Sequence, residues 1–243
     1  MFSFDTKVRY SELNELGLVR PEAIVNFLQD CTTYHSNSVG ADFEFFKREQ
    51  KLWVLNSWQI EIKEQLKQDE EITVCTWPYD FSGAYGHRNF VIKDKSGKHL
   101  VEANTLWVFA DMVTGRPIKL TEEYTKFYEL SEKLDMNYMD RKVKVPVDVI
   151  GREMEPITIK KAYIDTNGHV NNGRYVECAA EYIPVGAQVK RIRAEYKMQA
   201  KYGKMFYPVV YEAEGEENSK LITVLLNDEN GKTYASVEFD ICM

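Results

Sequence analysis

One short stretch of the chain concentrates the side chains best suited to proton chemistry. Within eight positions it places a carboxylate, an imidazole and three amides, in the order Asp165-Thr166-Asn167-Gly168-His169-Val170-Asn171-Asn172. An imidazole with an unperturbed pKa of about 6.5 suits general acid–base catalysis at neutral pH. A side-chain amide both donates and accepts hydrogen bonds. The stretch therefore predicts a site that activates water or moves a proton.

Each of these residues also has a purely structural interpretation. A single histidine ahead of a helix, one of four in the chain, is commonly structural. Asn167 precedes a glycine, which is typical of an Asx turn. Asp165 suits two roles equally, which are orienting Asn167 or His169 and making a hydrogen bond at the start of the helix. The pattern alone leaves these alternatives open.

The residues that follow predict a helix that positions this loop. The apolar residues recur at the spacing of one helical face: Tyr175, Cys178, Ala179, Tyr182 and Ile183. Asn171 or Asn172 is a suitable cap for the first turn, and Pro184 ends the pattern. We expect backbone N–H groups between Gly168 and Asn171 to receive an oxyanion at the positive end of the helix dipole.

Composition describes an ordinary globular protein. The 243 residues are 44% hydrophobic and 28% charged, and the net charge of −7 argues against nucleic acid as the main partner. The four cysteines are spread through apolar patterns, which favours reduced, buried thiols over disulfides or a zinc site: Cys31, Cys75, Cys178 and Cys242. Cys178 lies on the apolar helical face, so we interpret it as a small hydrophobe rather than a nucleophile.

No apolar run reaches the roughly 18 residues of a membrane-spanning helix. The first residues resemble neither a signal peptide nor a transit peptide. We therefore expect a soluble cytoplasmic protein that does not bind a membrane.

The order of elements predicted along the chain occurs twice. The first half reads as a strand at 2–10, a helix from Pro21 with Ile24, Phe27, Leu28 and Cys31 on one face, a short helix at 43–49, and strands at 52–62, 71–77, 86–93 and 99–110. The second half reads as a strand at 156–164, the polar loop, its helix, and strands at 189–200, 205–213, 220–227 and 233–241.

Register supports this repeat. Residues 16–19 lie over 167–170 at an offset of 151, whereas 94–98 and 60–62 lie over 228–232 and 194–196 at an offset of 134. The connection at 36–51 supplies the difference of 17 residues (151 − 134). The alternative is chance similarity between two β-rich halves.

Each half then needs a curved sheet against which its helix buries an apolar face. We predict an α+β protein with an N-terminal domain at 1–120, a connector at 121–150 with an amphipathic helix near 122–134, and a C-terminal domain at 151–243. The second copy has Asn167 and His169 where the first has Leu16 and Leu18. One copy keeps polar chemistry, and we expect its twin to line a pocket for an apolar ligand.

These features together resemble the acyl-ACP thioesterases, which have a double hotdog fold with a long helix wrapped by a curved antiparallel sheet in each half. The resemblance rests on Asp165 to Asn172, on Glu195-Tyr196-Lys197-Met198-Gln199-Ala200, and on the duplicated order of elements, and it covers nearly the whole chain. Family members often have Glu and Cys where this chain has Gln199 and Ala200. A carboxylate base and a cysteine nucleophile are therefore absent at those positions.

The resemblance implies hydrolysis of the thioester that joins a fatty acyl chain to the phosphopantetheine arm of acyl carrier protein (ACP). His169 would activate or orient the attacking water, and Asn167 would hold the water or the thioester carbonyl. Asp165 would orient these two, and Gln199 on the next strand would orient water. No metal or cofactor is implied, and the protein is expected to be a monomer or a homodimer.

Two further sets of residues suggest how substrate binds. Phe27, Trp53 and Trp58 suit the lining of an acyl tunnel, or else an ordinary core. The most basic stretch of the chain suits docking of the acidic carrier protein, or else a solvated strand edge, and its candidates are Lys190, Arg191, Arg193 and Lys197.

Three other functions remain open at this point. The motif does not separate ACP from CoA esters, so an acyl-CoA thioesterase is the first alternative. A non-catalytic protein that binds acyl thioesters is the second, although no basic DNA-reading helix accompanies the motif. A hotdog dehydratase would need a carboxylate opposite His169, and none is evident in the sequence.

Overall fold

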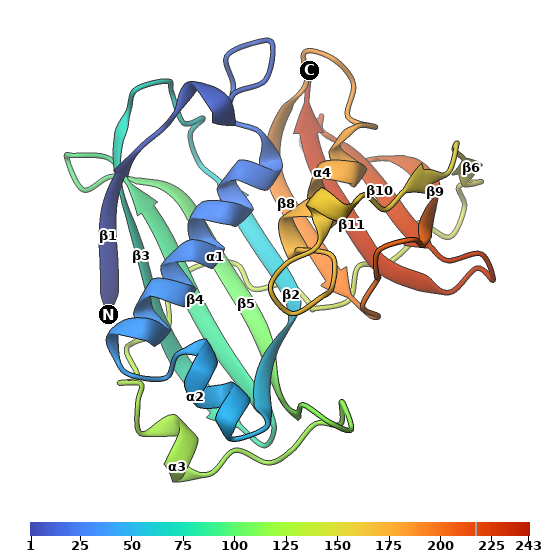
Figure 1. Cartoon of the computed structure of the whole chain (residues 1–243). Coiled ribbons are helices and arrows are strands. Elements are labelled where there is room, and N and C mark those ends of the chain that lie inside the picture. Colours follow the sequence, from blue (N-terminus) through green and yellow to red (C-terminus); the bar gives the residue numbers. More distant parts are fainter. Residues whose placement is uncertain (217) are drawn as a thin grey trace. The chain divides into compact units, whose positions relative to one another are not determined.

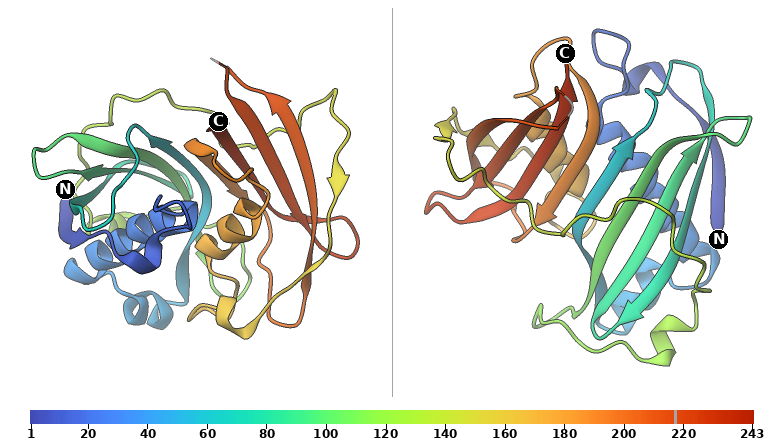
Figure 2. Two further views of the ribbon diagram at one scale, coloured as in Figure 1. Left: turned by 90° about the horizontal axis from the view of Figure 1, so that it is seen from above. Right: turned by 180° about the vertical axis from the view of Figure 1, so that it is seen from behind.

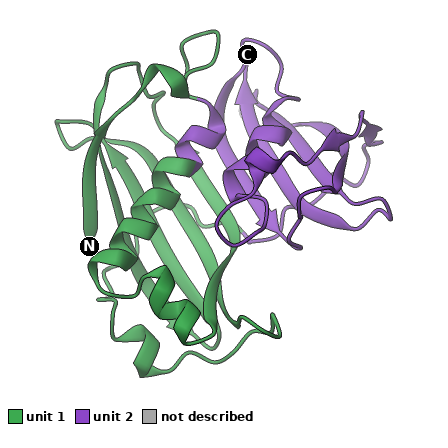
Figure 3. Cartoon of the chain, viewed as in Figure 1, with its two compact units in different colours: residues 1–19, 26–139 green, residues 20–25, 140–243 purple. Residues whose placement is uncertain are grey.

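The computed structural model describes residues 1–216 and 218–243. The chain forms two compact units, shown in Figure 3. Unit 1 comprises residues 1–19 and 26–139, and unit 2 comprises residues 20–25 and 140–243. No helix among the described residues is long and apolar enough to cross a membrane.

Unit 1 is an antiparallel sheet that curves around a helix (Figures 1 and 2). Its strands run in the order β1 (Phe2–Lys7), β3 (Glu71–Ser82), β4 (Tyr85–Lys93), β5 (His99–Asp111) and β2 (Lys51–Ile62). Unit 1 also holds residues 26–38 of helix α1 (Pro21–Ser38), helices α2 (Phe43–Arg48) and α3 (Glu122–Thr125), and a 3₁₀ turn at Tyr10–Glu12.

Helix α1 buries the face that the sequence predicts. Ile24, Phe27, Leu28 and Cys31 are each at most 4% exposed. The Cys31 thiol lies 3.4 Å from a backbone oxygen of β3, so this side of the helix faces the sheet.

Unit 2 repeats this arrangement with a shorter helix. Its strands run in the order β8 (Gln188–Tyr196), β11 (Thr233–Cys242), β10 (Lys220–Asn227), β9 (Met205–Glu214) and β6 (Arg152–Glu153), all antiparallel. A second short strand, β7 (Ile157–Thr158), also pairs with β9. Helix α4 (Asn172–Ala180) packs on β10 and β11, and a 3₁₀ turn covers Lys161–Tyr163.

The predicted repeat is confirmed by the hydrogen bonds of the two copies. In the first copy the Asn14 Oδ1 accepts from the N–H groups of Leu16 and Leu18, each at 3.0 Å. In the second copy the Asp165 Oδ1 accepts from those of Asn167 and His169, at 2.8 and 3.3 Å. Both loops are closed by an isolated bridge, Leu13 to Val19 and Ile164 to Val170. All of these pairs differ by the predicted offset of 151.

The hairpins repeat in the same way at an offset of 134. Asp94 Oδ1 accepts from the backbone N–H groups two and four residues ahead, and Asp228 Oδ1 does the same. Gly97 and Gly231 both have a positive φ, 86° and 77°. Strands β2 and β8 end at Ile62 and Tyr196, which also differ by 134.

The predicted helix at 122–134 is wrong beyond its first turn, because α3 ends at Thr125. Side chains of the sheet bind the backbone that follows it. Asn89 accepts from the Leu134 N–H at 3.1 Å. Gln59 donates to the Asn137 oxygen at 2.6 Å and accepts from the Met139 N–H at 2.8 Å. A backbone that is bonded to a sheet cannot also make helical hydrogen bonds.

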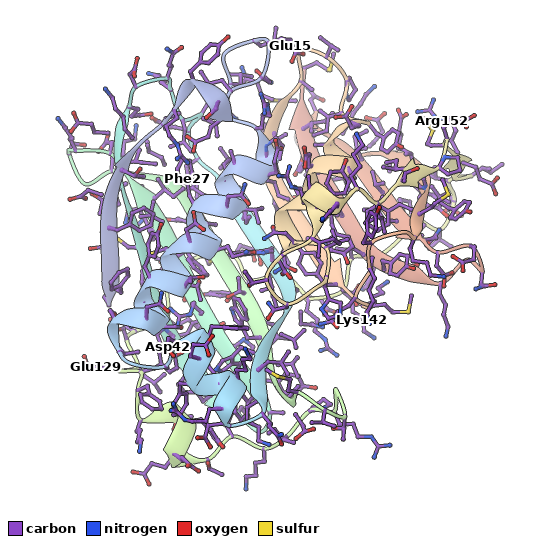
Figure 4. The ribbon with its side chains drawn as sticks, viewed as in Figure 1. Glu15, Phe27, Asp42, Glu129, Lys142 and Arg152 are labelled. Atoms are coloured by element: carbon purple, nitrogen blue, oxygen red, sulfur yellow. The ribbon has the colours of Figure 1, made fainter. Side chains whose placement is uncertain are left out.

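The connector is bound to unit 2 by the same kind of contact. Arg193 donates to the backbone oxygens of Asp140 and Lys142, both at 2.7 Å, and Glu195 accepts from the Val143 N–H at 3.3 Å. Lys142 is labelled in Figure 4. After α3, residues 134–143 of the connector are thus fixed by polar side chains of the strands.

Three boundaries in the second half also differ from expectation. The predicted strand at 156–164 is limited to β7 and is followed by the 3₁₀ turn. Helix α4 ends at Ala180, four residues before Pro184. Strand β8 ends at Tyr196, so Gln199 lies in the loop after the strand rather than on it.

Candidate active site

The loop before α4 is held by the carboxylate of Asp165. One of its oxygens accepts from the backbone N–H groups of Asn167 and His169, so it fixes the path of the backbone rather than either side chain. Gly168 has a φ of 77°, a conformation that glycine adopts without strain. Asn171 caps the helix by accepting from the Gly173 N–H at 2.9 Å. Both alternatives for Asp165 thus reduce to a positioning role for the whole loop.

The structure contradicts the expected oxyanion site on the backbone. The N–H groups of Gly168 and His169 both bond to Asp165, through its backbone oxygen and its carboxylate. Those of Val170 and Asn171 donate to the oxygens of Ala200 and Tyr163, at 3.0 and 2.9 Å. All four donors are therefore occupied. None of these four N–H groups is left to receive an oxyanion.

Asn167 offers a side-chain amide for this role. The residue is exposed, and its backbone N–H is the part that the turn uses. Its side-chain amide is therefore not needed for the turn, which Asp165 closes. An amide in this position can donate to a carbonyl oxygen from its nitrogen.

His169 is the titratable side chain of this loop whose ring has no structural duty. Its Nδ1 is buried and has no hydrogen-bond partner within the residues that the structure describes. Burial lowers the pKa of His169 below its ordinary value, and the nearby positive charge of Lys201 lowers it further, against an opposing effect of Asp165. The imidazole is therefore neutral at pH 7 and can accept a proton. An unpartnered buried nitrogen calls for an explanation, and a catalytic role and a bound water molecule are two such explanations.

The segment after β8 is fixed against this loop by two tyrosines that the sequence analysis missed. Tyr175, on α4, accepts from the Ala200 N–H at 2.9 Å, while the Ala200 oxygen accepts from Val170. Tyr196 donates to the Asn172 oxygen at 3.1 Å. The periodicity indicates that Tyr175 is buried, but it carries no signal that its hydroxyl is used.

Gln199 is next to this fixed residue and is exposed. The buried Ala200, 1% exposed, holds the backbone of the segment beside the polar loop. Gln199, Asn167 and His169 are thus carried by two segments that hydrogen bonds tie together.

Cys178 is buried, as predicted from its place on the helical face. Its side chain is 3% exposed, and burial raises the pKa of the thiol to about 12. A thiol of that kind is not ionised at neutral pH and is a poor nucleophile. Cys31 and Cys75 are also buried, and all four cysteines are free.

The aromatic residues predicted for an acyl tunnel all lie in unit 1. In the strand pairing, Trp53 lies opposite Phe109 of β5 and Trp58 lies opposite Thr105. Phe109 and Thr105 are four residues apart on one strand, so the two tryptophans lie on the same face of the sheet. A bulge between Leu55 and Ser57 makes this possible despite the odd spacing of the two tryptophans. Trp58 is 2% exposed and Phe27, labelled in Figure 4, is 4% exposed.

A buried cation that the sequence analysis did not single out lies on this face. Arg88 pairs with Thr105, is 6% exposed, and lies 2.9 Å from the His35 Nδ1 and 3.1 Å from the Thr76 hydroxyl. Burial and Arg88 lower the pKa of His35 to about 4, so His35 is neutral. Arg88 makes no ion pair within residues 1–216 and 218–243. Part of the predicted acyl-binding face is therefore polar.

In the apolar copy, Leu16 is 49% exposed and does not lie in a pocket interior. Its position matches that of the exposed Asn167, just as the half-buried Leu18 matches the half-buried His169. The exposure of Leu16 gives no support to the expectation that this loop lines a pocket.

The structure also changes the set of docking candidates. The Arg193 side chain is only 9% exposed and forms a 3.0 Å ion pair with Glu238. Arg191 pairs with Asp240 at 2.9 Å. A guanidinium that a carboxylate neutralises attracts an acidic partner less strongly, so these ion pairs disfavour Arg191 and Arg193 as docking residues.

Of the remaining two candidates, Lys197 pairs with Glu195 at 3.4 Å, with its side chain 38% exposed. Lys190 is exposed and lies near the start of β8. It is therefore at the opposite end of that strand from the polar loop.

Two units of one topology, of which one carries a polar loop before its helix, define a tandem hotdog protein. Solved structures share this fold along the whole chain. An acyl-ACP thioesterase from Bacteroides thetaiotaomicron has a TM-score of 0.86 at 22% identity, covering 99% of this chain and 97% of that one. The 12:0-ACP thioesterase from Umbellularia californica has a TM-score of 0.84 at 18% identity, covering 99% and 93%. The predicted fold class is confirmed.

Family models identify the chain more specifically. The N-terminal domain of the acyl-ACP thioesterases matches residues 1–128, and the C-terminal domain matches residues 148–241. This chain belongs to the acyl-ACP thioesterase family. The resemblance drawn from the polar loop is confirmed.

Curated relatives agree with this assignment. A chloroplastic palmitoyl-acyl carrier protein thioesterase from Gossypium hirsutum is 25% identical over 197 residues, or 76% of this chain and 48% of the relative. A chloroplastic oleoyl-acyl carrier protein thioesterase from Arabidopsis thaliana is 23% identical over 256 residues, or 97% and 69%. The chain spans about half the length of most of the curated relatives that it matches.

Proposed function

We propose that this chain hydrolyses fatty acyl-ACP thioesters to a free fatty acid and ACP. Membership of the family and the names of its relatives support this reaction. The observation that carries the proposal is the division of roles in the polar loop. Asp165 and the backbone N–H groups maintain the turn, and the side chains of Asn167 and His169 are left for substrate.

In the reaction, the neutral His169 accepts a proton from a water molecule as its oxygen attacks the thioester carbonyl carbon. The Asn167 amide nitrogen donates to the carbonyl oxygen as negative charge develops there. This replaces the backbone donors that the turn already occupies. The tetrahedral intermediate then collapses, the carbon–sulfur bond breaks, and the imidazolium returns its proton to the leaving thiolate. Gln199 orients the water and takes no proton.

The two halves divide the work of binding and chemistry. Residues 151–243 carry the polar loop, and residues 1–120 bind the acyl chain along the face of Trp58 and Phe27.

The location of the protein in the cytoplasm and its state as a monomer or homodimer are predictions from the sequence. The plant relatives are named as chloroplastic, so fractionation of the source cells is the test of location.

Replacement of His169 tests the mechanism. His169→Ala should lower kcat by about 10²- to 10⁴-fold on acyl-ACP, because a positioned base contributes that much. The matched control is His99→Ala, since His99 is 2.8 Å from Glu102 in unit 1 and has no role in the polar loop. Near-normal turnover by His169→Ala would contradict the mechanism.

Two other functions are separated by the choice of substrate. An acyl-CoA thioesterase would release thiol faster from acyl-CoA than from acyl-ACP of equal chain length. A non-catalytic binding protein would bind both thioesters and release thiol from neither.

A further inference from the structure

The two ends of the unit 2 sheet differ in charge. Strands β8, β11, β10 and β9 lie side by side and alternate in direction (Figure 1). The end of β8 and the start of β9 therefore lie at the same end of the sheet. The polar loop is at that end as well, because Val170 bonds to Ala200 and Ile159 bonds to Lys204.

Three exposed lysines gather at this end, and we call them the loop-end lysines. Lys160 and Lys161 come just before the polar loop, and Lys201 follows Ala200. None of the three makes an ion pair with another described residue. Lys201 is close enough to His169 for its charge to lower the pKa of that imidazole.

Two other cations at this end are already neutralised, whereas Lys232 lies further away in the hairpin between β10 and β11. Lys204 pairs with Glu229 at 3.0 Å, and Lys197 pairs with Glu195 at 3.4 Å. The three loop-end lysines therefore stand against the one carboxylate of the polar loop, Asp165, which leaves an excess of positive charge beside His169.

Among the described residues, the opposite end of the sheet carries acids and cations in equal number. It holds Glu212, Glu214 and Glu216 at the end of β9, and the carboxylate of Asp240 near the end of β11. Arg152 pairs with Glu212 and Arg191 pairs with Asp240. The other two cations of this end, Lys190 and Lys220, lie at the starts of β8 and β10 and balance Glu214 and Glu216. An acidic partner is thus favoured at the loop end over the other end.

We propose that the loop-end lysines are the surface on which the acidic carrier protein docks. This proposal rests on the proposed function, and it replaces Arg191 and Arg193 in that role. A chain with a net charge of −7 repels an acidic partner overall, so attraction depends on a local positive surface. A surface next to His169 also delivers a thioester tethered to the carrier directly to the reacting groups.

Charge reversal at one lysine from each end tests the location. Lys161→Glu and its matched control Lys190→Glu each change the charge by two units on an exposed residue of unit 2. Lys161→Glu should weaken binding of holo-ACP by roughly 3- to 10-fold at low salt, since one exposed ion pair is lost and one repulsion is added. Lys190→Glu should leave the Kd unchanged. Fluorescence anisotropy of labelled holo-ACP measures this without any turnover.

Kinetics with three thioesters of one acyl chain separate docking from chemistry. For Lys161→Glu the rise in KM should be largest for acyl-ACP, smaller for acyl-CoA and absent for acyl-N-acetylcysteamine. If KM rises equally for acyl-CoA, the lysines bind a phosphate group that acyl-CoA also carries rather than the protein surface of the carrier. The docking surface would be overturned if KM for the short thioester rose as much as KM for acyl-ACP. It would also be overturned if Lys190→Glu weakened the binding of holo-ACP as much as Lys161→Glu does.

The same measurements distinguish this inference from the proposed function. If the wild-type chain binds holo-ACP in a Lys161-dependent way but releases no thiol from any thioester, hydrolysis is wrong and the surface stands. If it hydrolyses acyl-ACP with a KM that does not respond to Lys161→Glu, hydrolysis stands and the surface is wrong.

Discussion

The hydroxyl of Tyr175 is the contact beside the polar loop whose removal has the most definite cost. Tyr175→Phe deletes one oxygen and keeps the ring, which packs 5.6 Å from the ring of Tyr196 and 5.3 Å from that of Phe206. The Ala200 N–H then loses its acceptor at a residue that is 1% exposed. A buried donor without a partner costs about 1–3 kcal/mol, and the apolar packing is unchanged.

Urea denaturation monitored by circular dichroism measures this loss. The free energy of unfolding should fall by about 1–3 kcal/mol with an unchanged m-value. Tyr182→Phe is the matched control, because Tyr182 lies beyond the end of α4 and is half-buried, and surface changes of this kind cost less than about 0.5 kcal/mol. Equal values for the two variants would refute the role of the hydroxyl.

The same substitution has a kinetic consequence. Ala200 accepts from Val170, so the hydroxyl indirectly fixes the polar loop beside Gln199. We expect kcat for acyl-ACP to fall while KM changes little, because the substitution leaves the loop-end lysines unchanged. A stability loss without any change in kcat would leave Tyr175 with a purely structural role.

Two other predictions concern charged groups. Because burial and Lys201 lower the pKa of His169, kcat/KM should rise with pH through an apparent pKa below about 6.5. Lys201→Gln should move this acidic limb of the pH–rate profile to higher pH, because a positive charge near the imidazole is removed. If the limb does not move, the assignment of His169 as the base is contradicted. Arg193→Met leaves the Glu238 carboxylate buried without its partner and should cost about 3–5 kcal/mol in urea denaturation. The exposed Arg152→Met, which breaks a pair with Glu212, should cost less than about 1 kcal/mol, and comparable losses would refute the difference in burial.

Much of the architecture was predictable because each half is built from strong local patterns. The apolar face of α1, the turn residues at Asp94 and Asp228, and the offsets between the copies all follow from the order of residue types. The backbone hydrogen bonds of the two loops repeat at the offset of 151 that the sequence indicates. Local sequence determines such turns, since the side chain that closes them is two to four residues from the donors.

The remainder depends on contacts between residues far apart in the chain. Gln59 and Asn89 hold a connector some 45 to 80 residues away, so a segment with helical periodicity becomes extended. Arg193 reads as an exposed cation in a basic stretch, but Glu238 on the neighbouring strand neutralises it. The occupied N–H groups of the polar loop were equally hidden, because one of their acceptors is Ala200 in a later segment.

The polar loop has a consequence for how such a protein evolves. Its shape depends on an oxygen at the first position, Asn14 or Asp165, and on a glycine three residues later. The side chains at the other two positions, asparagine and histidine in one copy and leucine in the other, contribute nothing to the turn. The same turn therefore accepts either polar or apolar side chains at these positions, so their chemistry can change while the shape of the backbone is kept.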